Sequence, residues 1–326
     1  MPKSTHLITI LLLATGPLSA CSGGNNPTDA VPLYDNLGEY HRAIDTDVEL
    51  AQSYFDQGLR LQYAFNHAEA IRSYREAVRL DPECAMCWWG IALALGPNIN
   101  APMDSASAAE AWSAITKARD LATGGPAAEQ ALIGALAQRF AADPVAERPP
   151  LDSAYASAMG VVSTSFPDDP DALTLYAASL MNLSPWFYWT GDYANREPRP
   201  DTPTMLENLE KALSLNPEHP GACHYYIHSV EAAYPERAVE CAERLAGLMP
   251  GAGHIVHMPG HIYIRVGRYA DAVEQNEHAV HADETYIQDQ NPRGLYPAGY
   301  YPHNYHFMWF AATMAGMSEK AMYAAR

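Results

Sequence analysis

Seven histidines in the C-terminal third of the chain fall into three short groups whose spacing indicates a common site. The groups are His224 and His228; His254, His257 and His261; and His303 and His306. The first and second groups are offset by 33 residues, and the second and third by 49, with two histidines matching at each offset. Because a constant offset is typical of structural repeats, we expect the groups to occupy equivalent places in three successive repeats.

Neighbouring histidines within each group are three or four residues apart, which places them on one face of a helix. Glu231 follows His228 by three residues and adds a carboxylate to the same face. Neutral imidazole is the commonest side-chain metal ligand, and three or four nitrogen or oxygen donors around one point suit zinc, copper or iron. We therefore predict that the seven histidines bind a transition metal, with copper or zinc favoured and iron also compatible.

Seven imidazoles are more than one tetrahedral ion needs. The histidines therefore predict either two ions, or one ion with spare imidazoles for proton transfer, and Glu231 is assigned as a ligand or a catalytic base. A metal-dependent oxidoreductase and a metal-dependent hydrolase both fit this pattern. The alternative, which stays open, is a metal-free groove in which the same histidines hold a peptide or an envelope protein through hydrogen bonds.

The tripeptide Met258-Pro259-Gly260 interrupts the second histidine group, and proline inside a helix costs about 3 kcal/mol or more. We expect either a kinked helix or a helix that begins at Pro259, with His254 and His257 in a preceding turn. Both arrangements keep the imidazoles close together.

Further side chains near the histidines are candidates for substrate contact. They are Tyr263, Tyr301, Asn304 and Tyr305. The Gly/Pro/Tyr-rich insertion 291–302 precedes the third histidine group; we expect it either to close over the site, with Arg293 binding an anionic ligand, or to form a packed connector. The aromatic segment 185–193 is interpreted as a cover over apolar helix faces, with one wall of a pocket as the alternative.

The elements that must position these residues are helices arranged in repeats. From Ala51 to Pro82, small and large apolar residues are spaced as in two antiparallel helices of one repeat of about 34 residues. The positions are Tyr54, Gly58, Leu61, Ala70, Tyr74, Ala77 and Pro82. This stretch resembles a tetratricopeptide repeat, with Gln57 as its main departure. The resemblance implies an all-α, tetratricopeptide-like α-solenoid of antiparallel helix pairs, whose first helices line a concave groove that the histidines face.

The three histidine segments resemble a histidine-rich group of bacterial tetratricopeptide lipoproteins, and this resemblance covers most of the chain. The expected parts are a signal peptide at 1–20, a lipidated cysteine and tether at 21–45, N-terminal repeats at 46–125, an irregular helical middle at 126–219 and C-terminal repeats at 220–326. In the middle part, helices are expected at 129–142, 153–165, 171–182 and 204–216. C-terminal helix pairs are expected at 221–250, at 253–283 and from 302 onward.

A solenoid needs a polar cap over its last repeat, and the sequence shows none before Arg326. We therefore expect further chain or a partner to cover this end.

The first residues are typical of an export signal, with Lys3 before an apolar run at 7–14. Leu18-Ser19-Ala20-Cys21 resembles a bacterial lipobox, which implies cleavage before Cys21, a lipid on that cysteine, and a place at the periplasmic face of the outer membrane. The formal net charge of -18 and a pI near 5.0 disfavour nucleic acid as a partner. We expect membrane contact only through the lipid.

Four cysteines remain after the signal, and they allow three pairings. They are Cys84, Cys87, Cys223 and Cys241. The pair at Cys84 and Cys87 has the C-x-x-C form, but Trp88 stands where a c-type haem attachment would require histidine. We interpret this pair as part of helix packing, with a disulfide as the alternative, rather than as a redox centre.

Overall fold

The computed structural model describes residues 31–192 and 195–326. The predicted signal peptide, the lipobox with Cys21 and the start of the tether therefore lie outside the described residues. The secondary-structure elements belong to one compact unit, Leu33–Arg326. Among the described residues, no helix combines the length and the apolar character needed to cross a membrane.

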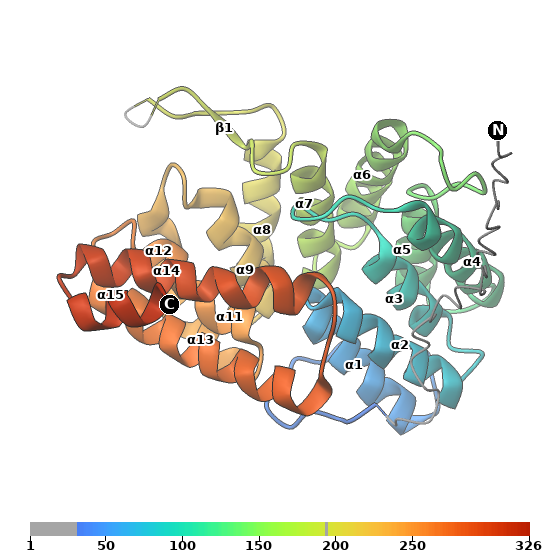
Figure 1. Cartoon of the computed structure of the whole chain (residues 1–326). Coiled ribbons are helices and arrows are strands. Elements are labelled where there is room, and N and C mark those ends of the chain that lie inside the picture. The colour runs from blue at the N-terminus through green and yellow to red at the C-terminus, as the bar shows by residue number, and fades with distance from the viewer. Residues whose placement is uncertain (1–30, 193–194) are drawn as a thin grey trace, which may run out of the picture. The chain divides into compact units, whose positions relative to one another are not determined.

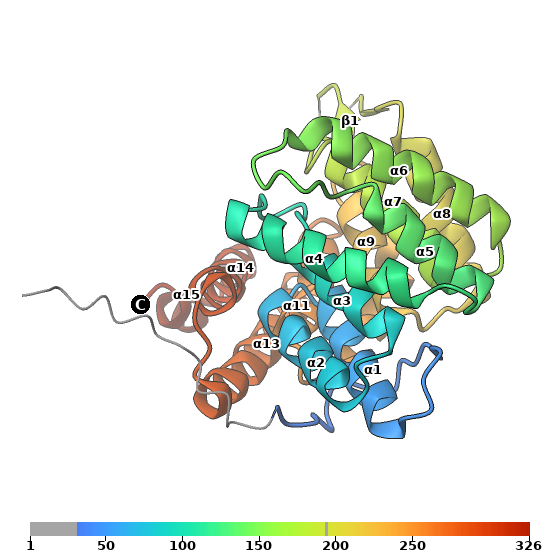
Figure 2. The same ribbon diagram turned by 90° about the vertical axis from the view of Figure 1, so that its right-hand side faces the viewer.

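The compact unit is all-α, with helices that follow one another as antiparallel neighbours (Figures 1 and 2). The helices are α1 Glu49–Tyr63, α2 His67–Leu80, α3 Ala85–Leu95, α4 Ser105–Leu121, α5 Ala127–Ala137, α6 Arg148–Ser165, α7 Pro170–Leu183, α8 Thr202–Leu215, α9 Pro220–Val230, α10 Val239–Leu248, α11 Gly253–His257, α12 Pro259–Tyr263, α13 Tyr269–Gln290, α14 Tyr301–Met314 and α15 Ser318–Ala324. A two-stranded antiparallel ribbon, β1 Trp189–Thr190 and β2 Glu197–Pro198, connects α7 to α8. The predicted all-α, tetratricopeptide-like fold is confirmed.

The first repeat shows why small residues stand where the sequence has them. Tyr74 of α2 is buried, and its ring lies against Gly58 of α1 and Gly90 of α3, where an added Cβ would come within 2.6 and 2.5 Å of the ring. Gln57 is also buried; its amide donates to Ser73 Oγ at 3.1 Å and accepts from the backbone of Tyr34 at 2.8 Å. Gln57, which departs from the repeat pattern, therefore bonds α1 to the segment that precedes it.

The middle part is helical as expected, but two boundaries were predicted wrongly. The helix expected at 129–142 is α5, which begins after Pro126 and ends at Ala137. The helix expected at 153–165 is α6, which begins at Arg148 because two prolines occupy its first turn, where a missing N–H costs nothing. The other two helices lie within two residues of their predicted bounds.

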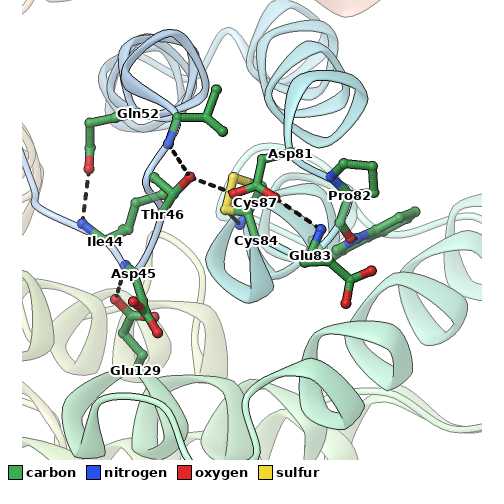
Figure 3. The surroundings of a disulfide bond; sticks show 12 residues. Ile44, Asp45, Thr46, Gln52, Asp81, Pro82, Glu83, Cys84, Cys87 and Glu129 are labelled. Atoms are coloured by element: carbon green, nitrogen blue, oxygen red, sulfur yellow. Dashed lines mark hydrogen bonds between the residues drawn. A yellow bond between two sulfur atoms is a disulfide. The ribbon is translucent and has the colours of Figure 1, made fainter.

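Cys84 and Cys87 form a disulfide within the first turn of α3, so the alternative interpretation of this pair holds. Figure 3 shows its surroundings, in which Asp81 accepts hydrogen bonds from Thr46 Oγ1 at 2.5 Å and from the backbone of Glu83 at 3.1 Å. The disulfide and these bonds fix the turn between α2 and α3.

A buried carboxylate joins the N-terminal segment to α7 and α9. Asp171 is bonded by Arg42 at 2.9 Å, by Tyr40 Oη at 2.9 Å and by His219 Nε2 at 3.2 Å, and Tyr63 Oη also donates to it. Burial alone would raise the pKa of Asp171, but His219 and Arg42 hold that pKa below its usual range. His219 also caps α9, because its Nδ1 accepts a hydrogen bond from the backbone N–H of Ala222 at 3.1 Å.

The C-terminal repeats fold back against the N-terminal repeats. Tyr286 of α13 donates to Glu69 of α2 at 3.2 Å, and Asn100, after α3, donates to Tyr300 at 2.8 Å. Figures 1 and 2 both show the orange α11 and α13 beside the blue α1 and α2. The inner face of the last repeats is therefore covered by the first repeat instead of lining an open groove.

Candidate metal centre

Six of the seven predicted histidine ligands converge from four helices. His224 and His228 lie on α9, His254 and His257 on α11, His261 on α12 and His303 on α14. The first five are at most 5% exposed and His303 is half-buried. They therefore face the interior formed where the C-terminal and N-terminal repeats meet.

The proline interruption does not separate the histidines of the second group. Met258 keeps helical torsion angles, φ -53° and ψ -36°, and Pro259 takes the first position of α12. The rings of His257 and His261 remain 4.8 Å apart between centroids. The expectation of a helix that begins at Pro259, after a turn that carries the earlier histidines, is confirmed.

The six imidazoles form two triads that lie side by side. The first triad is His224, His228 and His254, and the second is His257, His261 and His303; within each, one nitrogen per ring lies within 4.8 Å of the others. Across the triads, the rings of His228 and His261 are 5.0 Å apart. Three imidazoles on one point match the protein ligand set of a three-histidine metal site, so the geometry offers two such positions.

Four of the imidazoles are oriented by an acceptor outside the triads, and each uses Nδ1 for this contact. The contacts are His224 with the carbonyl of Tyr63 at 2.6 Å, His257 with Asn276 Oδ1 at 2.7 Å, His261 with Glu231 at 2.8 Å and His228 with Glu231 at 3.2 Å. An acceptor on Nδ1 fixes the proton there and leaves the lone pair on Nε2. The arrangement is the one that metal-binding histidines use.

Three of the inner nitrogens have no protein partner, and two others pair only with each other. Nε2 of His228, His257 and His261 is buried and finds no hydrogen-bond partner among the described residues. Nε2 of His224 faces Nε2 of His254 at 3.1 Å, close to the separation of about 3.3 Å between two imidazole ligands of one tetrahedral ion. Buried polar atoms are rarely left unpaired in folded proteins, so these nitrogens indicate a ligand.

Burial and mutual repulsion favour the neutral form of five of the six imidazoles. Desolvation, followed by the charge of neighbouring histidines, lowers the pKa of His224, His254 and His257 well below the usual value. Burial likewise lowers the pKa of His228, and it lowers the pKa of His303 to about 4. The lone pairs are therefore available at neutral pH.

Glu231 supplies the single carboxylate of the cluster. Its two oxygens are directed at the Nδ1 atoms of His228 and His261, from opposite triads. Burial would raise the pKa of this carboxyl, but His261 and His228 hold the pKa below its usual range, so the group is ionised. The contacts give Glu231 a positioning role behind two histidines. Glu231, His228 and His261 also form a third group of possible ligand atoms within 4.8 Å of one another, so the role of Glu231 as ligand or base stays a prediction.

His306 does not join the cluster, contrary to the prediction. It is exposed and stacks on Trp309, with centroids 5.8 Å apart. Phe307 takes the inner place, and its ring lies 4.6 Å from His257 and 4.4 Å from His261. Phe307 follows His303 by four residues and is rotated about 40° from it around the helix axis. His306 follows by three residues and is rotated about 60° in the opposite sense. The side of α14 that faces the cluster is the one that carries His303 and Phe307.

Two of the tyrosines predicted to contact substrate point away from the cluster together. Tyr301 and Tyr305 both donate to Glu284, at 3.0 and 3.1 Å, on the outer side of α13 and α14. Tyr263 lies two residues after His261, on the opposite side of α12, where Arg268 covers its ring at 4.2 Å. None of the three lines the cavity beside the histidines.

The other two predicted contact residues are also absent from the cavity lining. Asn304 is buried, but it donates to Asp283 at 2.7 Å. Arg293 is exposed in the connector between α13 and α14. The connector itself is mostly helical: α13 extends to Gln290 and a π-helical turn, Tyr296–Tyr300, leads directly into α14.

A cavity of about 520 Å³ lies against the histidine cluster. Its lining includes His228, Glu231, His254, His261 and His303 and the aromatic side chains Trp186, Tyr188, Trp189, Tyr300 and Phe307. Trp186 meets the ring of His228 edge-on at 4.9 Å, and Tyr300 lies 4.7 Å from His254. Trp186, Tyr188 and Trp189 of the aromatic segment thus form one wall of the pocket, which was the alternative interpretation.

Phe65, Phe307 and Asn276 contact the cluster although sequence reasoning did not select them. Phe65 lies two residues after the end of α1, where it has a positive φ of 58°, and its ring lies 4.5 Å from that of His224. Phe307 follows His303 by four residues, a spacing that could have identified it. Phe65 comes from another repeat, and Asn276 lies on the second helix of the repeat that carries His257, 19 residues further along, so no helical spacing marks either of them.

The tetratricopeptide-repeat family model matches residues 51–84. Solved structures similar to this chain include yeast Tom70, with 11% identity, a TM-score of 0.44 and coverage of 82% of this chain and 47% of that chain. A structure of MamA has 12% identity and a TM-score of 0.33, and the match covers 76% of this chain and 98% of that chain. The structure of a MamA RS-1 ArsTM double mutant has 16% identity and a TM-score of 0.36, and the match covers 54% of this chain and 85% of that chain. At these TM-scores the likenesses carry no inference about function.

Comparison with the curated proteins gives no match. The family match and the helix pairs described above agree on the architecture. The chain therefore contains a tetratricopeptide repeat at 51–84, within an all-α, tetratricopeptide-like fold.

Proposed function

We propose that the protein binds one or two transition-metal ions in the histidine cluster, with copper or zinc favoured and iron compatible. The observation that carries this proposal is the set of buried Nε2 atoms without a partner, on rings whose Nδ1 atoms are already fixed. Imidazole nitrogen suits all three metals, and it is a poor ligand set for calcium or magnesium, which prefer oxygen.

The burial of the histidines favours a metal over the metal-free alternative. A peptide held through hydrogen bonds needs imidazoles that it can reach, but five of the six converging histidines are at most 5% exposed. A bare ion is small enough to enter from the adjacent cavity, and neutral imidazoles are ready to bind it.

An open coordination position at each triad supports a catalytic role over simple storage. Each triad supplies three protein ligands, and members of both triads line the same cavity. Three protein ligands with one free position are typical of catalytic zinc sites, whereas structural sites are closed by four. Metal-dependent oxidation and metal-dependent hydrolysis are both compatible with this ligand set.

The direct test is elemental analysis of the protein purified without a histidine tag. We expect near-stoichiometric copper, zinc or iron in the wild type and loss of that metal in the His257→Ala/His261→Ala variant. The matched control is His278→Ala/His281→Ala, which removes two exposed histidines from α13. Circular dichroism shows whether each variant remains helical.

Two results would overturn the proposal. One is a wild-type protein that holds no metal after reconstitution with each of the three ions. The other is equal loss of metal in the cluster variant and in the control, which would place the metal elsewhere.

We also propose that a lipid on Cys21 tethers the protein to the periplasmic face of the outer membrane. The lipobox-like Leu18-Ser19-Ala20-Cys21 supports this location. Partition of the full chain into a detergent phase, lost on Cys21→Ser, is the expected result, and partition that survives this substitution would contradict it.

A further inference from the structure

We propose that the cavity beside the histidine cluster binds a small organic anion with an aromatic body, whose anionic group pairs with Arg265. This inference deepens the proposed function, since it names the class of ligand that would meet the metal. The groups that would hold the ligand, Arg265 and the aromatic walls, are not among the histidines, so binding can be tested in the metal-free protein.

The walls of the cavity fit a flat apolar group. Trp186, Trp189, Tyr300 and Phe307 contribute aromatic rings from three separate segments, and Leu295 completes the lining beside them. Aromatic rings bury large apolar areas and favour other rings in edge-on or offset arrangements. A volume of about 520 Å³ lies in the range of small-molecule sites, typically about 300–1,000 Å³.

Arg265 is the one cationic side chain of this lining among the described residues. It follows α12, is exposed, and its guanidinium has neither an ion pair nor a hydrogen bond within the described part of the chain. The nearby Arg268 differs, because it pairs with Glu243 at 2.7 Å and with Asp271 at 2.5 Å. A planar guanidinium without a protein partner is suited to bidentate binding of a carboxylate.

The position of Arg265 also sets the orientation of the ligand. It lines a second cavity of about 250 Å³ together with His306, Phe307 and Phe310, so it stands where the two spaces adjoin. His228, His254 and His261 lie in the lining of the first cavity, and the carboxylate of Glu231 is directed at two of these histidines. When its anionic group is bound at Arg265, the aromatic body of the ligand therefore extends toward the imidazoles.

The test uses 3-phenylpropionate as the probe and chelator-treated, metal-free protein. Isothermal calorimetry and quenching of tryptophan fluorescence report saturable binding. Its neutral amide, 3-phenylpropanamide, has the same shape without the charge. We expect the amide to bind at least about tenfold more weakly than the acid, since charge-assisted hydrogen bonds are the stronger class.

The variants separate Arg265 from general effects of charge. Arg265→Gln should weaken binding of the acid at least about tenfold and leave binding of the amide nearly unchanged. Arg119→Gln is the matched control, because Arg119 on α4 is also exposed and lines neither cavity. Trp186→Ala should weaken the acid and the amide alike.

Absence of saturable binding to the wild type would overturn the inference, and so would equal affinity for acid and amide, or equal effects of the two arginine substitutions. Metal content, measured on the same samples, keeps the two proposals distinct. A protein that binds metal but no probe would refute only this inference. A protein that binds the probe but no metal would support this inference and refute the proposed function.

Discussion

At the scale of single residues, the contact that unites the two triads is Glu231. Its carboxylate lies within hydrogen-bond distance of Nδ1 of His228 on α9 and of Nδ1 of His261 on α12. No other described residue is hydrogen-bonded to both triads. Loss of such an outer partner usually costs metal sites about 10–100-fold in affinity, because the ligand ring loses its orientation and part of its basicity.

We therefore expect Glu231→Gln to lower the metal affinity about 10–100-fold while the metal stoichiometry is kept at saturating metal. Competition against a chelator of known affinity measures the change. Glu236→Gln, which alters an exposed carboxylate in the following turn, serves as the control and should have no effect. Unchanged affinity in Glu231→Gln would show that the carboxylate does not position the ligands.

Local spacing explains how far these residues could be predicted. The pair His224 and His228 follows from helical geometry alone, and so does the carboxylate three residues later. The choice between Phe307 and His306 depends on which way α14 is rotated, and this rotation is set by packing against α13. The carbonyl of Tyr63 comes from a chain segment 161 residues from His224, so no sequence interval indicates it.

At the scale of elements, a second pair of cysteines connects α9, which carries His224 and His228, to α10. Cys223 Sγ on α9 and Cys241 Sγ on α10 are buried and 2.7 Å apart, within about 0.7 Å of the length of a disulfide bond. We expect a thiol–disulfide oxidant to join them, with two electrons passing to the oxidant and two protons released. The bond would tie α9 to α10 and fix the position of His224.

Titration of the unfolded, unreduced Cys21→Ser protein with a thiol reagent tests this pairing. No reactive thiol is the expected count, since Cys84 and Cys87 are already joined. Two reactive thiols after exposure to the oxidant would contradict it. Cys241→Ser provides the reference, because it should expose one thiol.

The helix boundaries show which local signals are reliable. Helix identity was predictable throughout because repeat spacing and apolar periodicity agree. The start of α6 was predicted five residues too late, although the first turn of a helix tolerates the two prolines that occupy it. The restart at Pro259 was predictable for the same reason, since proline fits the first position of α12.

At the scale of the whole molecule, the first repeat covers the histidine cluster of the last repeats. Phe65, at the end of α1, is 4% exposed and contacts His224 at 4.5 Å and His254 at 5.5 Å between ring centroids. The sequence predicted the solenoid correctly, but it predicted an open groove. The turn that brings the last repeats back onto the first is a sum of small rotations between successive repeats, and these rotations cannot be read from the spacing of residues.

We expect Phe65→Ala to lower the free energy of unfolding by about 3–5 kcal/mol, because it leaves a cavity between the first and last repeats. Urea unfolding followed by circular dichroism gives the value. Phe187→Ala removes a ring that is 69% exposed, and it should change the free energy by less than about 0.5 kcal/mol. A small effect of Phe65→Ala would mean that the first repeat does not seal the cluster.

Stability of the metal-free protein should fall on acidification. Burial lowers the pKa of His224, His254 and His257 in the folded state, so below the unfolded value of about 6.5 the unfolded chain binds more protons. Stability then rises with pH in this window by up to about 1.4 kcal/mol per pH unit for each histidine. Asp283 acts in the opposite direction, because burial raises its pKa to about 7.

Six histidines have a lowered pKa and three carboxyls, Asp56, Glu129 and Asp283, have a raised one, so the free energy of unfolding should decrease from pH 7 to pH 5. Urea midpoints at pH 7, 6 and 5 measure this slope. The His257→Ala variant should show a shallower slope, and a wild-type slope that is flat or inverted would contradict the neutral state assigned to the cluster.

The most direct measurement is anomalous diffraction from crystals of the metal-loaded protein, collected at the copper and zinc absorption edges. We expect one or two peaks, each about 2.0–2.1 Å from imidazole nitrogens of the triads His224/His228/His254 and His257/His261/His303. A loaded protein without a peak in the cluster, or with its peak at His278 and His281 on α13, would contradict the metal centre.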